Sequence, residues 1–129
     1  MTSRHIGVVV RAPRDAVYDF ARDPAHLPRW AAGLATGDVA VGGDALVLDS
    51  PMGRVSVRFA PRNAFGVLDH DVTLPTGEVV HNPLRVLEHP EGSEVVFTLR
   101  QGAASDADLE RDAALVAADL ERLRELLEP

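Results

Sequence analysis

The sequence contains no cysteine and no lysine among its 129 residues. The absence of cysteine excludes disulfides, zinc–thiolate sites and thiol nucleophiles, and it fits a reducing compartment. No apolar run approaches the roughly 20 residues needed to span a bilayer, and the first residues lack the basic and then apolar layout of a signal peptide. These absences predict a cytoplasmic protein with no membrane span.

Positive charge is scarce, since 13 basic residues face 20 acidic ones and the net charge is -7. Negative charge disfavours attraction to nucleic acid and to anionic lipid, so we expect neither partner. All of the basic residues are arginines, which is typical of a GC-rich bacterial genome. The length suits one domain over residues 1–129, large enough to bury about two thirds of its unfolded surface.

The first elements are a strand and a short helix. Residues 5–11 are β-branched and alternate well enough for a strand, which Pro13 ends. Pro13 is placed for the first position of a helix, because its missing N–H is not needed there. We expect Ala16, Val17 and Phe20 to share the buried side of this helix.

A second short helix is predicted directly afterwards. Asp23 is a capping side chain and Pro24 follows it at the first helical position. This helix carries Leu27 and Trp30, and Pro28 kinks or shortens it.

From about residue 35 to residue 100 the apolar residues alternate with period two, which is typical of strands with one buried face. Turn residues such as the run 42–44 separate six alternating runs. With the first strand they predict a sheet of about seven antiparallel strands. The runs are 39–41, 46–48, 55–59, 68–74, 80–86 and 95–99.

The run Pro75-Thr76-Gly77 predicts a three-residue hairpin loop, a type I turn closed by glycine in the left-handed conformation. This loop length fixes the register of the two strands that it joins. The expected pairs are Leu74 with Glu78, Val72 with Val80, Asp71 with His81, His70 with Asn82 and Leu68 with Leu84. Asp71 and His81 then form an ion pair on the outer, solvated face.

His70 and Asn82 lie opposite one another in an otherwise aliphatic stripe, so they are candidate polar contacts for a ligand. The alternative is that they satisfy the core by hydrogen-bonding each other or a trapped water. Successive strand residues point to opposite faces, so Asp69 and Asp71 do not share a metal shell with His70. We expect no metal and no cofactor.

The last quarter of the sequence predicts a long amphipathic helix over about residues 106–128, with Ser105 as its N-cap. Its apolar positions recur at spacings of four, three, four, three and four. They are Leu109, Ala113, Val116, Leu120, Leu123 and Leu127. A single helix with this stripe must cover the apolar face of the sheet, and it can enclose a cavity there.

The order of these elements resembles the START-like, helix-grip superfamily, which includes the polyketide cyclase/dehydrase and lipid-transport group. The most specific stretch is the run from Ala12 to Phe20 with Asp23-Pro24 and Trp30. It is similar to the family's A-P-x-x-x-V-(Y/F)-x-(F/L) motif, which D-P and a tryptophan follow. The resemblance implies an α+β fold: a curved antiparallel sheet with two short helices after its first strand and a long C-terminal helix packed over it.

The resemblance also implies a hydrophobic ligand, polyketide-, lipid- or quinone-like, in a cavity between sheet and C-terminal helix. One alternative is a cyclase or dehydratase that uses His70 as general acid or base. Another is a protein-interaction module of the chaperone or ribosome-associated kind. The oligomeric state is open, monomer or homodimer. Candidate ligand-binding residues are His70, Asn82, Trp30, Phe59, Phe97, Val116, Leu120 and Leu123, and Tyr18 is a further candidate for the cavity entrance.

Overall fold

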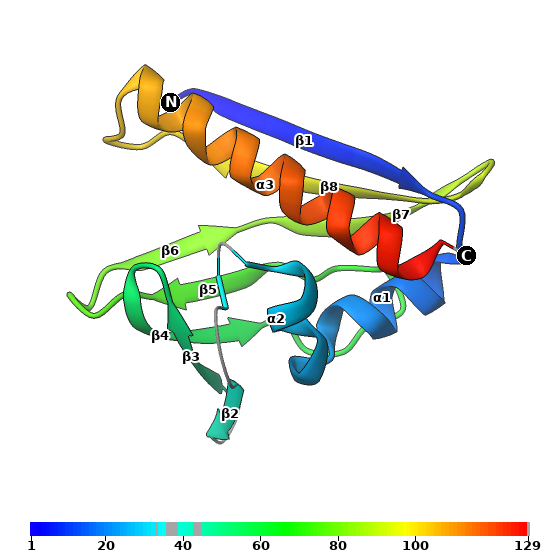
Figure 1. The fold of residues 1–129 in the computed structure, drawn as a ribbon, viewed down its shortest axis with the longest axis horizontal. Coiled ribbons are helices and arrows are strands. Elements are labelled where there is room, and N and C mark those ends of the chain that lie inside the picture. The colour runs from blue at the N-terminus through cyan, green and yellow to red at the C-terminus, as the bar shows by residue number, and fades with distance from the viewer. Residues whose placement is uncertain (33, 36–38, 43–44, 129) are drawn as a thin grey trace.

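A computed structural model describes residues 1–32, 34–35, 39–42 and 45–128, so the turn predicted at 42–44 lies largely outside the described residues. The fold is α+β, as the sequence predicts, with the long helix α3 running alongside β1 (Figure 1). The helices are α1 (Arg14–Arg22), α2 (Leu27–Trp30) and α3 (Asp106–Leu127), and a 3-10 turn, η1 (Pro24–His26), precedes α2. The strands are β1 (Ser3–Val10), β2 (Val39–Gly42), β3 (Ala45–Ser50), β4 (Gly53–Phe59), β5 (His70–Thr73), β6 (Val79–Asn82), β7 (Leu84–His89) and β8 (Gly92–Arg100).

Within the described residues there are eight strands, which form two antiparallel sheets ordered β1-β8-β7 and β2-β3-β4-β5-β6. The run predicted as one strand over 80–86 is divided at Pro83, whose nitrogen has no hydrogen to donate to a ladder. Backbone hydrogen bonds continue across this division. Leu68 N donates to Leu84 O at 2.8 Å, and Thr98 N donates to Pro83 O at 2.9 Å. The two sheets therefore meet edge to edge instead of forming separate layers.

The hairpin of β5 and β6 has the predicted register. His70 pairs with Asn82, Asp71 with His81 and Val72 with Val80. Gly77 closes the loop with φ of 89°, a left-handed conformation that glycine adopts without steric cost. Gly77 N donates to Leu74 O at 2.9 Å, as a tight turn requires.

The buried face of helix α1 is shifted from the one predicted, since Val17 is buried and Phe20 packs against the core as expected, but Tyr18 and not Ala16 lies beside them. Val17, Tyr18 and Ala21 are buried, whereas Ala16 is exposed. Tyr18 can be buried because its hydroxyl accepts a hydrogen bond from Asn63 N at 3.0 Å, which satisfies its polar end. Pro13 is the N-cap residue and not the first helical residue, so the helix begins one residue later than predicted.

The segment after α1 follows the predicted capping. The Asp23 side chain accepts a hydrogen bond from Ala25 N at 2.9 Å, and Pro24 opens η1. Helix α2, which contains Pro28, is only four residues long. It ends at Trp30, which is 5% exposed, and it packs against α3.

Helix α3 lies against β1, β8 and α2, so it covers the sheet as predicted. The Ser105 side chain accepts a hydrogen bond from Asp108 N, which satisfies one of the free N–H groups at the helix start. Leu109, Ala113, Leu120 and Leu123 are buried, and Val116 and Leu127 are partly buried against the same core. The apolar stripe of the sequence is thus the buried face of the helix.

Candidate functional site

A cavity of about 350 Å³ lies between α3, α2 and the sheet. Its deep wall contains the fully buried Leu27 and Leu84. Its mouth contains Met52, Val80 and Leu115, which are large apolar side chains that are exposed to solvent. The cavity is therefore mainly apolar and opens to the surface.

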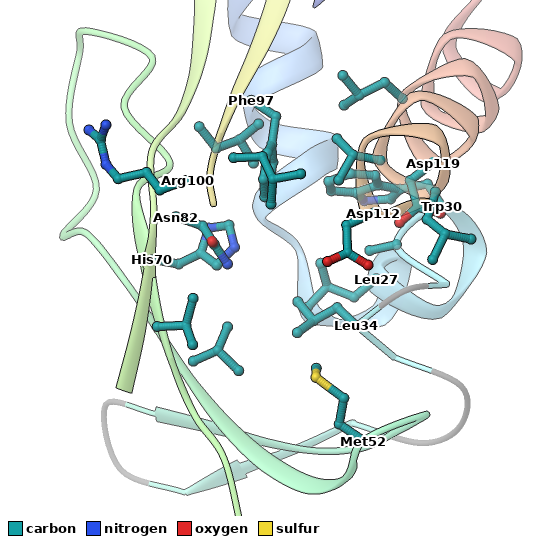
Figure 2. A pocket seen from close by; sticks show the side chains of 18 of the residues that line it. Leu27, Trp30, Leu34, Met52, His70, Asn82, Phe97, Arg100, Asp112 and Asp119 are labelled. Atoms are coloured by element: carbon teal, nitrogen blue, oxygen red, sulfur yellow. The ribbon is translucent and has the colours of Figure 1, made fainter. Parts of the chain in front are cut away.

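Figure 2 shows the polar side chains on two facing walls of the cavity. His70, Asn82 and Arg100 lie on the sheet side, and Asp112 and Asp119 lie on the helix side. The sheet wall thus places an imidazole and an amide in an apolar cavity. The charged groups of the cavity come from both walls, Arg100 from the sheet and the two aspartates from α3.

All but one of the predicted ligand-binding residues line this cavity. Those that line it are Trp30, Phe59, His70, Asn82, Phe97, Val116 and Leu120. The exception is Leu123, which has no exposed surface and belongs to the solid core. Tyr18 lies elsewhere, against the loop that contains Asn63. Binding by the lining residues stays a prediction.

The His70 ring lies between two aromatic rings of the cavity wall. Its centroid is 5.1 Å from that of Phe59 and 6.2 Å from that of Phe97. His70 is 5% exposed, and this burial lowers the pKa of the imidazole below its usual value. The ring is therefore neutral at neutral pH.

One hydrogen bond decides which nitrogen of His70 holds the proton. Nδ1 lies 2.9 Å from Leu68 O, and because a carbonyl can only accept, Nδ1 must be the donor. In the neutral ring Nε2 then has a lone pair and no hydrogen. His70 consequently offers an acceptor at its second nitrogen.

Nε2 is open to the cavity. It has no hydrogen-bond partner among the described residues. In the same residues the fully buried side-chain atoms without a partner are Arg22 Nε, Trp30 Nε1 and Arg122 Nε, and His70 Nε2 is not one of them. Nε2 therefore keeps an accessible surface, which the cavity supplies.

Asn82 is the cross-strand partner of His70, and its side chain is half-buried. Its amide has no hydrogen bond to any described residue, so the two side chains do not satisfy each other. The mutual hydrogen bond between them is therefore absent from this structure, and the other alternative, a trapped water, stays a prediction. Directly opposite residues have Cβ atoms about 4.5–5.5 Å apart, which lets one ligand group contact both.

The neighbours of His70 in the sequence point away from the cavity. Asp69 accepts two hydrogen bonds from Arg85, both at 2.7 Å, and this pairing holds the pKa of the Asp69 carboxyl below its usual value. Asp71 Oδ1 lies 2.7 Å from His81 Nδ1, the outer-face pair that the register predicts. Within the described part of the chain, no three acidic or histidine side chains are grouped to hold a metal ion.

The charged residues of the cavity rim were missed by the sequence reasoning. Arg100 ends β8, and its Nη1 donates to Ser3 Oγ at 3.0 Å. Asp112 and Asp119 lie on α3, and Asp119 is hydrogen-bonded to Arg122. In the sequence they look like ordinary surface charges, and only the crossing of helix and sheet brings them to one opening.

No helix in the described part of the chain is long and apolar enough to cross a membrane. No protein-family model and no curated protein matches the sequence.

Solved structures do match the fold. The chain is similar to the Aha1 dimer from Colwellia psychrerythraea, with 14% identity and a TM-score of 0.79 over 99% of this chain and 97% of that one. An uncharacterised protein from Bacillus thuringiensis has 15% identity and a TM-score of 0.76 over 98% of each chain. DynU16, a protein in the dynemicin biosynthetic locus, has 15% identity and a TM-score of 0.76. The match covers 97% of this chain but 46% of DynU16, so this chain spans less than half of that protein.

Proposed function

We propose that this helix-grip, START-like fold binds a hydrophobic small molecule, polyketide-, lipid- or quinone-like, in the cavity beneath α3. The observation that carries the proposal is a mainly apolar cavity of about 350 Å³ with two polar groups on its sheet wall, His70 Nε2 and the Asn82 amide, that have no hydrogen-bond partner in the described residues. Ligand sites have this character: concave, mostly apolar, with a few placed polar groups. The place of DynU16 in a biosynthetic locus supports a small-molecule ligand for this fold.

The exposed apolar side chains at the mouth support the same function. Met52, Val80 and Leu115 are 52%, 38% and 54% exposed, and all three line the cavity. Apolar groups gathered at an opening favour entry of an apolar ligand, whereas a docking surface for a protein needs a broad contiguous patch. They therefore support ligand binding over the interaction-module alternative.

To test the proposal, a substitution on α3 fills part of the cavity. Val116 is partly buried and lines the cavity, so Val116→Phe places an aromatic ring in the ligand's space. Ala117 is exposed on the same helix, so Ala117→Phe adds the same ring outside the cavity. Binding of 2-naphthol, decan-1-ol and a short-chain quinone is measured by calorimetry and by native mass spectrometry.

We expect at least one probe to bind the unmodified protein, Val116→Phe to weaken that binding by about tenfold or more, and Ala117→Phe to leave it unchanged. Failure of every probe to bind, or equal binding by both variants, contradicts the proposal. Thermal unfolding without ligand shows that each variant is folded.

A second candidate function, a cyclase or dehydratase, is favoured by the neutral His70 imidazole with its accessible Nε2. Such a nitrogen can take a proton from a bound polyketone, provided that the reacting carbon lies within hydrogen-bond reach of it. The measurement is turnover of a linear polyketone thioester by the protein and by His70→Ala. Loss of turnover in the variant supports the enzyme, and unchanged turnover removes His70 from this role.

A further inference from the structure

We infer that the cavity selects ligands that present a hydroxyl group to its sheet wall, and that this hydroxyl donates its hydrogen to His70 Nε2 while its oxygen accepts a hydrogen bond from the Asn82 amide. The inference rests on the proposed function, because it names the class of ligand that the same cavity takes. Alcohols and phenols belong to this class, whereas ethers, ketones and carboxylates do not.

The hydrogen bond at His70 has a fixed direction. Leu68 O occupies Nδ1, and this carbonyl can only accept, so the proton of the neutral ring is fixed on Nδ1. Burial keeps the ring neutral by lowering its pKa. A ligand group that contacts Nε2 must therefore supply a hydrogen.

The neighbouring strand supplies a second polar group. Asn82 pairs with His70 across β5 and β6, and its amide has no partner among the described residues. An amide has both donor and acceptor ends. A hydroxyl whose hydrogen goes to Nε2 still has lone pairs, so the NH₂ end of Asn82 completes its coordination.

The surroundings of His70 disfavour an anionic ligand group. Phe59 and Phe97 flank His70, so an anion placed there loses water without gaining a cation beside it. The charged side chains on the facing wall, Asp112 and Asp119, are carboxylates that are paired with Arg111 and Arg122 of the same helix, so they offer no cation to an anionic ligand (Figure 2). The cation at the rim, Arg100, is exposed, and it donates to Ser3 Oγ.

An ether or ketone oxygen also fits poorly. It can accept from Asn82, but it brings its lone pairs against the lone pair of Nε2 and leaves that acceptor unsatisfied. A site built to bind a hydroxyl rejects analogues without the hydrogen because its own buried polar groups lose their partners. The geometry thus distinguishes molecules of nearly equal shape.

The experiment uses four naphthalenes that share one ring system: 2-naphthol, 2-methoxynaphthalene, 2-methylnaphthalene and 2-naphthoate. Dissociation constants are measured by calorimetry with the full chain. We expect 2-naphthol to bind about tenfold or more tightly than each of the other three, which corresponds to one or two net hydrogen bonds. In His70→Phe and Asn82→Leu this preference falls, while the affinity for 2-methylnaphthalene changes little.

His81→Gln is the matched control, because it changes a histidine of the same strand pair on the outer face. We expect it to keep the preference for 2-naphthol. If His70→Phe does not fold, the ¹⁵N resonance of Nε2 in the unmodified protein gives the answer, since it moves upfield when Nε2 accepts a hydrogen bond.

Equal affinities for 2-naphthol and 2-methoxynaphthalene, tighter binding of 2-naphthoate, or an Nε2 resonance that stays unchanged at saturation would overturn this inference while the proposed function stands. Absence of binding by all four probes, together with the probes tested above, overturns both. Displacement of 2-naphthol by decan-1-ol but not by decanoate extends the hydroxyl preference to aliphatic ligands and supports the inference.

Discussion

Burial gives His70 its chemistry, because an imidazole at 5% exposure binds a proton less readily than one in water. The hydrogen bond from Nδ1 to Leu68 O then aligns the ring and leaves Nε2 as an acceptor. The same hydrogen bond to Leu68 O favours the charged ring, as do Asp69 and Asp71, whereas His81 opposes it. Desolvation outweighs them and lowers the pKa.

This lowered pKa makes the free energy of unfolding depend on pH. Between the folded pKa and the unfolded value of 6.5, the unfolded chain binds the proton and the folded chain does not. Stability is therefore full above about pH 6.5 and falls as the pH drops below it, by at most about 1.4 kcal/mol per pH unit. His70→Phe should remove this contribution.

Urea unfolding at about pH 7.5 and about pH 5.5 checks the prediction. We expect the unmodified protein to lose more stability between the two values than His70→Phe does, since the acidic groups are common to both proteins. Parallel losses would mean that His70 takes up its proton equally in both states.

Tyr18 has a structural role that its position in the motif from Ala12 to Phe20 does not indicate. Its hydroxyl accepts the backbone hydrogen of Asn63 at 3.0 Å, and the ring is 4% exposed. Tyr18→Phe leaves this N–H without its partner, so we expect a loss of about 1–3 kcal/mol in the free energy of unfolding. Because Tyr18 does not line the cavity, 2-naphthol binding should be unchanged. A stability loss under about 0.5 kcal/mol would show that water replaces the hydroxyl.

At the scale of the elements, α3 has one apolar face with two uses. Leu120 is 1% exposed and lines the cavity, whereas Leu123 is fully buried in the core and does not line it. The two side chains are one turn apart on the same helix. This pairing separates the stabilising role of the helix from its role as cavity wall.

Leu120→Ala and Leu123→Ala should each lower the free energy of unfolding by about 2–5 kcal/mol, since each leaves a space in a packed interior. Only Leu120→Ala should also change the affinity for 2-naphthol. The checks are urea unfolding and calorimetry at a temperature where both variants remain folded. Unchanged binding in Leu120→Ala would show that Leu120 contributes only to core packing. Altered binding in Leu123→Ala would show that the cavity extends further along the helix.

At the scale of the whole molecule, local turn chemistry was enough to predict the sheet wall of the site. Gly77 fixes the loop, the loop fixes the register, and the register pairs His70 with Asn82. The stripe of α3 was predictable for a similar reason, because a period near 3.6 states which side chains share a face. Both features depend on short-range geometry.

Features that depend on tertiary contact were not predictable in the same way. Tyr18 replaces Ala16 on the buried face of α1 because the backbone N–H of Asn63, far along the chain, donates a hydrogen bond to its hydroxyl. Arg100 and Asp112 join the cavity rim only through the crossing of α3 over the sheet. Leu123 continues the pattern of Leu120, yet it lies beyond the end of the cavity.

The most direct test of the account asks whether one bound molecule contacts helix and sheet together. The measurement is an isotope-filtered NOE spectrum of the labelled protein with 2-naphthol. We predict NOEs from the naphthol ring both to the methyl groups of Val116 and Leu120 on α3 and to the His70 ring on β5. NOEs confined to exposed methyl groups such as those of Val79 and Leu87, or none at all at saturating ligand, would contradict a ligand cavity between helix and sheet.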